Sequence, residues 1–412
     1  MPRVRRASHV FFRCRDAQTL DIESLLQGRL VVGRRPELVA ISLLTGDELG
    51  VTREELDLLA ELPADWVDEE ELPEPARQMA HGLARRGLVI SDESDPDLER
   101  LRSRDERLAG DAWHPYAALY HFGTRDRVPS FVPLEPGEDG PVQMTAAALQ
   151  AFVDRFGPPP PPFSEPPGTE VVELPLHRED MPLVDVLRKR RTTRAFNAES
   201  LLPLDQLSIV LDSVFGCLAY VQIGDDLAVR KSSPSGGGLH PIEVYPLVVG
   251  VESLETGVYH YRPRTHELAL LHPLDRAAAR RFATVATAGQ TFLASAHVLF
   301  LLTARFYRSF WKYRAHDRAY AVLLMDAAHL SQTLYVMCTA LGLGAFVTGA
   351  IDRVAIEDRL GVDAFGEGAI AAAGCGIPAA ERLPGEPEFK AYVPRETELP
   401  QGAASTDSPT ER

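Results

Sequence analysis

The chain has 412 residues, 45% of them hydrophobic and 25% charged, which is an ordinary globular composition. Its formal net charge of -16 argues against nucleic-acid binding. The four cysteines lie far apart without a C-x-x-C pair, so we expect neither a disulfide framework nor a zinc site. No apolar run is long enough for a signal peptide or a bilayer span, so we expect a cytoplasmic protein that does not bind membranes.

Residues 1–110 are expected to form a small winged-helix-like domain. Residues 52–62 predict a helix with Thr52 as N-cap and Glu55 completing a capping box. Residues 73–93 predict a second helix that ends at Gly87, followed by a short strand. Such a module can bind a peptide, act as a scaffold or bind DNA. The acidic stretch at 65–76 makes DNA the least favoured of the three.

Residues 111–179 are expected to connect this domain to the rest of the chain. They include the sequence FGPPPPPFSEPPGTE at 156–170, whose proline density predicts a stiff, extended linker. Residues 396–412 are small and polar, which predicts a disordered tail. These boundaries leave residues 180–395 as the second domain.

The second domain alternates between helical and strand patterns. Helices are predicted at 181–196, 203–221, 274–288 and 317–344. Strands are predicted at 243–250, 297–306 and 368–378, with a hairpin at 257–273. Pro246 suggests that its strand is an edge strand or contains a bulge. The helix at 317–344 is apolar almost all round, as expected in the middle of a domain or at a dimer interface. We therefore predict an α+β sheet flanked by helices.

A basic cluster with the sequence RKRRTTRAF lies at 188–196, where the helix predicted at 181–196 ends. Its guanidinium and hydroxyl groups are those that a phosphate monoester needs. A solvated basic end that favours the helix dipole is the alternative, and the cluster alone does not decide between them.

Three consecutive glycines occur in the sequence SSPSGGGLHPIEVYPLVVG at 232–250, before a predicted strand. Glycine costs conformational entropy on folding, so the run needs a reason. Either it forms a plain turn, or a large flat group approaches the backbone there. The run lacks the lysine and hydroxyl residue of a P-loop and the spacing of G-x-G-x-x-G, so neither phosphate-binding motif applies.

Several motifs together resemble the SagB-type or ThcOx-type peptide dehydrogenases of the nitroreductase-like flavin proteins. They are the arginines and threonine of the basic cluster, PSGGGLHPIEVY at 234–245, GVYHYRP at 257–263, WKYRAHDRAY at 311–320 and LGLGAF at 341–346. The resemblance covers roughly residues 180–390 and implies a nitroreductase-like flavin fold with a central, mainly antiparallel sheet. It also implies FMN, an obligate homodimer with each flavin between subunits, a precursor peptide as substrate and a possible cyclodehydratase partner.

The resemblance assigns the cofactor-binding residues. Those expected to hold the phosphate and ribityl chain of FMN are Arg190, Arg191, Thr192 and Arg194. Those expected to pass along the flat ring system, from the partner subunit, are Pro234, Ser235, Gly236, Gly237, Gly238 and Leu239, which we call the glycine loop. His240 would either hydrogen-bond the flavin or shape this loop. Those expected to line the ring near N5 are Phe346, Val347, Thr348 and Gly349. His329 is interpreted as a core histidine, and no metal is expected because no HExxH or carboxylate set appears.

Lys312 and Tyr313 match a pair linked to catalysis in the SagB-type enzymes. A lysine whose pKa is lowered by burial would take a proton from the substrate while flavin N5 takes a hydride. Tyr313 would orient the ring or share the proton. The alternative is that Lys312 is exposed and Tyr313 serves packing.

Three functions follow. The first is an FMN-dependent dehydrogenase that matures a ribosomally synthesised peptide by oxidising thiazoline or oxazoline rings to azoles. The second is a general NAD(P)H-dependent nitro or quinone reductase. The third is a non-catalytic, peptide-binding scaffold for a cyclodehydratase.

Overall fold

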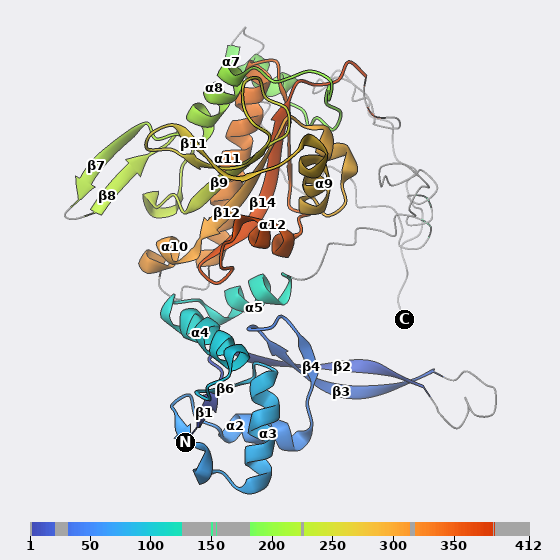
Figure 1. Ribbon diagram of the computed structural model, residues 1–412, viewed down its shortest axis with the longest axis vertical. Coiled ribbons are helices and arrows are strands. Elements are labelled where there is room, and N and C mark those ends of the chain that lie inside the picture. Colours follow the sequence, from blue (N-terminus) through green and yellow to red (C-terminus); the bar gives the residue numbers. More distant parts are fainter. Residues whose placement is uncertain are drawn as a thin grey trace, which may run out of the picture.

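The computed structural model describes residues 2–20, 32–125, 182–223, 226–313 and 318–381, with the single positions 150, 154 and 383. The predicted proline-rich linker at 156–170 and the tail at 396–412 lie outside these residues. A smaller N-terminal part and a larger C-terminal part lie one above the other, with two helices between them (Figure 1).

The described residues of the N-terminal part form two small antiparallel sheets and four α-helices. Its strands are β1 (Arg3–Arg6), β2 (Val10–Leu20), β3 (Val32–Ser42), β4 (Glu48–Gly50), β5 (Val67–Asp68) and β6 (Val89–Ser91). Its helices are α2 (Arg53–Glu61), α3 (Glu74–Arg85), α4 (Pro96–Gly110) and α5 (Pro115–Gly123). The sheets have the orders β5-β1-β6 and β2-β3-β4. The predicted capping box of α2 is confirmed, because Thr52 and Glu55 each accept a hydrogen bond from the other's backbone N–H. The winged-helix interpretation stays a prediction.

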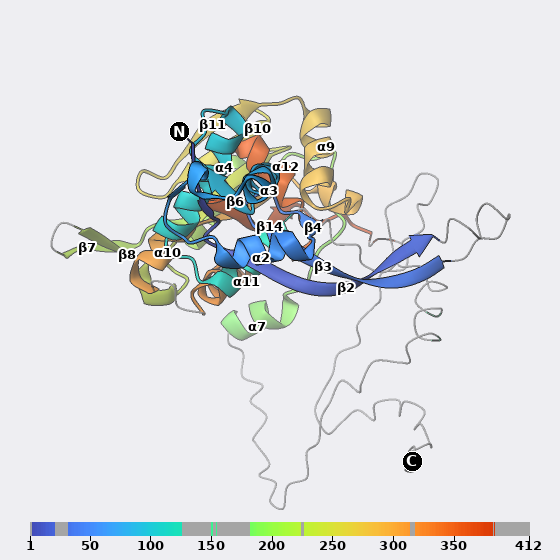
Figure 2. The same ribbon diagram turned by 90° about the horizontal axis from the view of Figure 1, so that it is seen from below.

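The C-terminal part is built on a six-stranded sheet of order β11-β10-β9-β12-β14-β13, in which every neighbouring pair is antiparallel. Its strands are β9 (Ile242–Val248), β10 (Gly257–Arg262), β11 (Glu267–Pro273), β12 (Val298–Arg305), β13 (Gly344–Thr348) and β14 (Glu367–Gly376). A separate hairpin, β7 (Ala219–Ile223) and β8 (Asp226–Arg230), projects from the body on the side opposite to the β2–β3 ribbon (Figures 1 and 2).

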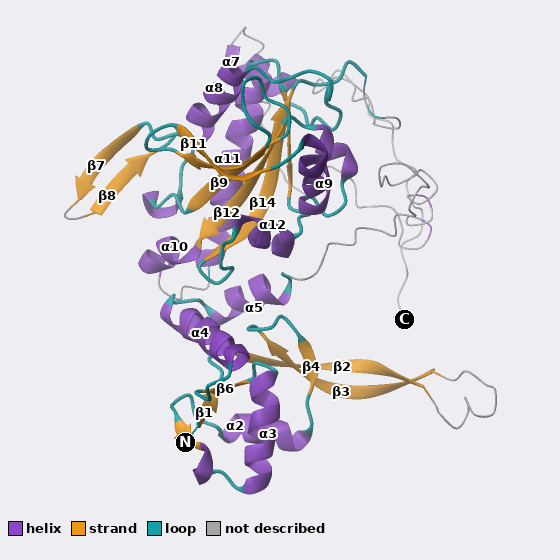
Figure 3. Ribbon diagram, viewed as in Figure 1, coloured by secondary structure: helices purple, strands orange, loops and turns teal. Residues whose placement is uncertain are grey.

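Helices cover both faces of this sheet (Figure 3). They are α7 (Pro182–Lys189), α8 (Leu204–Phe215), α9 (Arg276–Ala286), α10 (Phe306–Tyr313), α11 (Ala319–Ala340) and α12 (Arg353–Leu360). Phe300 and Leu302 of β12 pack in the hydrophobic cluster that contains α8 and α11, while Leu299 and Leu301 pack with α9 and α12. A strand that is buried on both faces reads as a continuous apolar run, which is why β12 could be predicted. The predicted α+β class with a mainly antiparallel sheet is confirmed.

Three details of the predicted elements are wrong. The helix predicted at 181–196 ends at Lys189, and Thr192 forms an isolated β-bridge with Ala345. The strand that contains Pro246 is not at an edge, because β9 pairs with both β10 and β12. The ladder to β10 joins only Leu247 and Val248 and so stops beside Pro246, where the missing N–H has no bond to make. The helix predicted at 203–221 ends at Phe215 with Gly216 as its C-cap, and the next residues form β7.

α11 is the one described helix that is long and apolar enough to cross a membrane by length and composition alone. Its buried side chains Leu323, Leu330 and Leu334 pack in the same cluster as the sheet, which is the place of a core helix.

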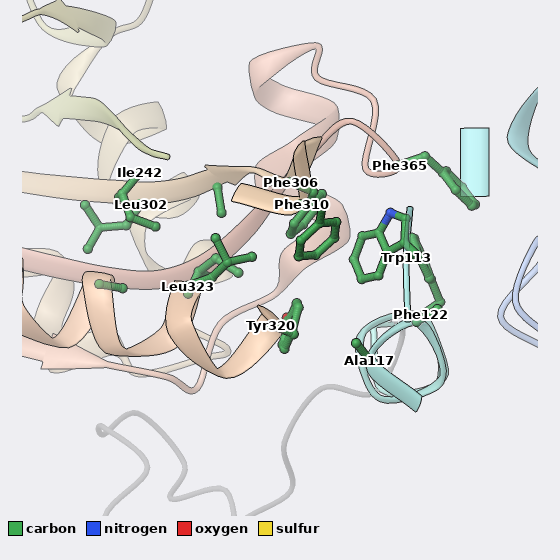
Figure 4. Close-up of a cluster of buried hydrophobic side chains, with 14 of the residues drawn as sticks. Trp113, Ala117, Phe122, Ile242, Leu302, Phe306, Phe310, Tyr320, Leu323 and Phe365 are labelled. Carbon is green, nitrogen blue, oxygen red and sulfur yellow. The ribbon is translucent and has the colours of Figure 1, made fainter. Parts of the chain in front are cut away.

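An aromatic cluster joins the two parts of the chain (Figure 4). The ring of Trp113, which precedes α5, lies 4.8 Å from that of Phe306 and 4.9 Å from that of Phe310, both on α10. Phe122 of α5 stacks on Phe365 at 4.4 Å. These residues belong to one buried cluster that continues from the N-terminal sheet to one face of the large sheet, so the two parts share a hydrophobic core.

Candidate functional site

The glycine loop adopts a backbone that favours glycine. Gly237 and Gly238 have φ angles of 64° and 69°, in the left-handed region that residues with a Cβ rarely adopt. His240, directly after the loop, has a φ of 46°. The predicted turn is therefore a specific, tight conformation that puts backbone at the surface beside α11.

A buried carboxylate on α11 holds this conformation. Asp326, 4% exposed, accepts a hydrogen bond from Ser235 Oγ at 2.6 Å and one from the backbone N–H of Gly236 at 3.0 Å. Ser235 Oγ in turn accepts one from the N–H of His240 at 2.9 Å. Asp326 was missed in the sequence analysis, although a single carboxylate within a long apolar helix is an unusual feature that points to a polar partner.

Further contacts fix both ends of the loop. Nδ1 of His329 lies 3.2 Å from the carbonyl oxygen of Pro234, so this half-buried histidine supports the loop rather than the core. Arg308 of α10 donates from Nε to the carbonyl oxygen of Leu239 at 2.6 Å. The loop is thus tied to both α10 and α11.

Lys312 and Tyr313, at the end of α10, lie against the loop. A Cβ placed on Gly237 would be 2.9 Å from Lys312 Nζ and 3.0 Å from the Tyr313 hydroxyl oxygen. A Cβ on Gly236 would be 3.6 Å from the same hydroxyl. The predicted pair and the predicted glycine loop therefore come together in one chain. Lys312 is exposed, so the burial on which its predicted role depends is not present in the single chain.

The basic cluster is built onto β13. The N–H of Thr193 donates to the carbonyl oxygen of Ala345 at 2.8 Å, and a Cβ on Gly344 would lie only 2.6 Å from the Thr193 side chain. The hydroxyl of Thr192 lies 3.1 Å from that of Tyr335 on α11, which also accepts from the N–H of Val347 at 3.1 Å.

One arginine of this cluster contacts Tyr335. The guanidinium of Arg190 stacks over the Tyr335 ring, 5.2 Å from its centre. Arg191 and Arg194 are exposed. Arg190 and Thr192 therefore contact the same tyrosine, and the exposed Arg191 and Arg194 are their neighbours in the chain.

The four residues predicted to line the ring divide into two kinds. The Phe346 side chain is 1% exposed and packs against Phe196, so it supports the core. The hydroxyl of Thr348 accepts from Gln290 Nε2 and from the N–H of Ala350, which fixes the end of β13. Val347 is exposed, and a Cβ on Gly349 would meet open space.

The glycine loop and the basic cluster contact the same helix at two levels. Asp326 and Tyr335 are nine positions apart on α11, which corresponds to roughly 13 Å along its axis. A Cβ on Gly238 would also meet open space. Open space beside glycine backbone suits a flat ring, and clustered guanidinium groups suit a phosphate, so the residues present fit FMN.

His240 is oriented towards the protein. Burial lowers its pKa, and the nearby Lys231 lowers it further, while a hydrogen bond to the backbone of Val229 acts in the opposite direction. Burial also lowers the pKa of Lys231. These contacts favour the interpretation in which His240 shapes the loop. Within the ranges that the structure describes, no three potential metal ligands cluster.

Comparisons with known proteins agree with this fold. Residues 187–377 match the model of the nitroreductase family. A protein assigned as a nitroreductase in Methanocaldococcus jannaschii is 34% identical over 187 residues, which are 45% of this chain and 88% of that protein.

Two further matches are a trifolitoxin-processing protein and a chain of a microcin synthetase. The trifolitoxin-processing protein TfxB of Rhizobium leguminosarum bv. trifolii is 33% identical over 146 residues, 35% of this chain and only 39% of TfxB. A chain of the E. coli microcin synthetase McbBCD complex with truncated pro-MccB17 bound is 20% identical with a TM-score of 0.46, over 65% of this chain and 96% of that one. Given the family model and the archaeal relative, this chain belongs to the nitroreductase family of oxidoreductases, whose members typically bind a flavin.

Proposed function

We propose that this protein is an FMN-dependent dehydrogenase that matures a ribosomally synthesised peptide by oxidising thiazoline or oxazoline rings to azoles. One observation carries the proposal: Lys312 and Tyr313 lie against Gly237 of the glycine loop. The similarity to TfxB, a protein named for trifolitoxin processing, supports a peptide as the substrate.

The residues divide the chemistry as follows. Oxidation of an azoline to an azole removes a proton from one ring carbon and a hydride from its neighbour. Bound FMN supplies the hydride acceptor. The amine of Lys312 takes the proton, and the Tyr313 hydroxyl, next to the same glycine, orients the ring. Asp326 acts as a positioning residue that keeps the loop in place.

The proposal includes a homodimer, since Lys312 needs burial to work as a neutral base and is exposed in the single chain. α11 presents an exposed apolar stripe that a second copy would cover. It contains Leu324 at 40% exposure and Met325 at 57%, next to the exposed Ala321 and Ala328. An apolar stripe of this kind on a core helix is typical of a subunit interface.

The test is a purified protein with its flavin content measured after heat release, followed by incubation with a thiazoline-containing peptide. We expect about one FMN per chain and a mass loss of two hydrogens from the peptide. Lys312→Ala should retain FMN and lose peptide oxidation. Lys312→Arg should be equally inactive, because a guanidinium keeps the charge but does not deprotonate. Turnover by either variant at the wild-type rate contradicts the base assignment.

A general NAD(P)H-dependent reductase is the second candidate. The relative in Methanocaldococcus jannaschii favours it, since the alignment spans most of that protein. Rapid bleaching of the flavin by NADPH, with no oxidation of thiazoline peptides, selects this function. If the protein cannot be loaded with FMN, both oxidoreductase functions are excluded. A non-catalytic, peptide-binding scaffold is then the remaining function.

A further inference from the structure

One face of α10 is packed against the N-terminal part of the chain. The rings of Phe306 and Phe310 lie 4.8 and 4.9 Å from the indole of Trp113, measured between ring centres, and Figure 4 shows both of them next to it. Trp113 stands between α4 and α5 and is 3% exposed. A residue from outside the C-terminal part therefore fills the space beside α10.

The opposite face of α10 makes contacts with the glycine loop. Arg308 and Lys312 each follow one of the two core phenylalanines by two positions, so they lie about 200° around the helix from those rings. Arg308 Nε donates to the carbonyl oxygen of Leu239 at 2.6 Å, and Lys312 Nζ would be 2.9 Å from a Cβ on Gly237. The helix is thus held between Trp113 on one side and the loop on the other.

The position of α10 depends on both of these contacts. The helix has eight residues, and so short a helix relies on tertiary packing for its stability. Its Phe306 ring is already tight against β14, since a Cβ on Gly368 would lie 2.9 Å from it. Removal of the indole would open space on the side away from the loop, and α10 would relax into it. This shift would draw Arg308 and Lys312 away from the loop.

The indole of Trp113 acts through its ring and not through its N–H. Nε1 is buried and has no hydrogen-bond partner among the residues that the structure describes. Besides the two phenylalanines of α10, the ring contacts Phe122 and Tyr320, at 5.1 and 6.0 Å between ring centres. Phenylalanine at position 113 would keep an aromatic ring among these side chains and would lose no hydrogen bond.

Building on the proposed function, we propose that Trp113 is a positioning residue for Lys312. The N-terminal part then acts on the oxidation step itself, even for a substrate too small to contact it. Proton transfer to Lys312 depends on the position of its amine, and a displacement of about 1 Å by a remote change can lower a rate about a hundredfold. The loss is expected in kcat rather than in KM.

The first test measures the position of α10 without any substrate. Hydrogen exchange, followed by mass spectrometry on the full-length protein as purified, reports local opening segment by segment. In Trp113→Ala we expect residues 306–313 and 235–240 to exchange about tenfold faster than in the wild type, while β12 exchanges at an unchanged rate. Trp113→Phe should restore most of the protection.

Leu59→Ala is the matched control. Leu59 is 1% exposed on α2, which packs against α3, so this variant makes a cavity between those helices instead of beside α10. We expect faster exchange in α2 and α3 and unchanged exchange at 306–313. The proposal is wrong if 306–313 exchanges as in the wild type in Trp113→Ala, or as fast in Leu59→Ala as in Trp113→Ala.

The second test measures oxidation of a small thiazoline ester. Trp113→Ala should lower kcat about tenfold to a hundredfold with KM changed less than about twofold, while Trp113→Phe and Leu59→Ala should stay close to the wild type. An unchanged kcat in Trp113→Ala, or a change in KM alone, overturns the proposal. A wild type that oxidises no ester contradicts the proposed function instead, and hydrogen exchange then decides on its own whether Trp113 holds α10 and the loop.

Discussion

The hydroxyl of Ser235 donates a hydrogen bond of 2.6 Å to Asp326, which ties the glycine loop to α11. The second oxygen of the same carboxylate accepts from the N–H of Gly236. One buried acid therefore fixes both a side chain and the backbone of the loop. Lys312 and Tyr313 lie against Gly237 of the loop held in this way.

Removing this acid should release the loop. Asp326→Ala leaves a hydroxyl and an N–H without their acceptor, at a cost of about 1–3 kcal/mol for each buried group. We expect FMN to dissociate more readily from Asp326→Ala and its peptide oxidation to fall, while Asp326→Asn should be less affected. The fraction of flavin that each variant retains during gel filtration measures this dissociation. Arg281→Ala, at an exposed position of α9, is the control, and equal retention in both variants contradicts the role of Asp326.

Two neighbouring glycines should respond differently to alanine. Gly237 and Gly238 share a positive φ, which costs alanine about 1–2 kcal/mol in either place. Only at Gly237 would the new methyl group crowd Lys312 and Tyr313. In the flavin-free protein Gly237→Ala should therefore be the less stable in urea unfolding. An equal free energy of unfolding for the two variants would show that Lys312 and Tyr313 do not pack against Gly237.

The basic cluster should control cofactor affinity. In Arg190→Ala with Arg194→Ala, two guanidinium groups are lost, and a hydrogen bond to a charged group contributes roughly 1.5–3 kcal/mol. We expect the double variant to be purified with much less FMN. Flavin absorbance per chain gives the result, and Arg264→Ala, exposed in the turn between β10 and β11, is the matched control. Full occupancy in the double variant excludes a phosphate contact.

Association of two chains should depend on the exposed stripe of α11. Met325→Glu places a charge where the second copy would pack, so the dimer should dissociate. Light scattering after gel filtration measures the mass of the particle. Val285→Glu, at a 47% exposed position of α9 on the other face of the sheet, should leave the mass unchanged. A monomeric wild type contradicts the homodimer outright.

Stability should fall in mild acid because of a buried histidine between the two parts of the chain. Burial holds the pKa of His121 well below its usual 6.5, and Arg353 and Arg125 lower it further. The unfolded chain therefore binds a proton below pH 6.5 that the folded chain refuses, and stability is lost as the pH falls below 6.5. The slope is at most about 1.4 kcal/mol per pH unit for this single group.

A double variant isolates this contribution. His121 Nδ1 lies 2.7 Å from the hydroxyl of Tyr320, so His121→Phe with Tyr320→Phe removes both partners and leaves neither unpaired. Urea unfolding at pH 7.5 and at pH 5.5 should show a smaller loss of stability in the double variant than in the wild type. The same loss in both assigns the pH dependence to other groups.

Much of the fold could be predicted because its sequence patterns are local. β12 reads as a continuous apolar run because clusters cover both of its faces, and the β10–β11 hairpin shows two strand patterns around a polar turn. The prediction of an edge strand from Pro246 was wrong because a proline is also tolerated where the pairing with a neighbouring strand ends. The pairing of β9 with β10 ends beside Pro246, and the sequence of β9 alone does not show this.

The candidate site could be predicted only where the chain itself carries a motif. The glycine loop and Lys312 were found in this way. Asp326 was not, because its partners lie 90 and 91 positions earlier in the sequence, and no local pattern reports a contact of that span. Arg308 was missed for the same reason, since Leu239 is 69 positions away from it.

The aromatic cluster around Trp113 has a consequence for how this chain can evolve. Trp113 packs against Phe306, Phe310 and Tyr320, so recombination that replaced the chain up to and including α5 would leave a void beside α10. A change that adapts the N-terminal part to a new partner is therefore also a change to the support of the helix that carries Lys312.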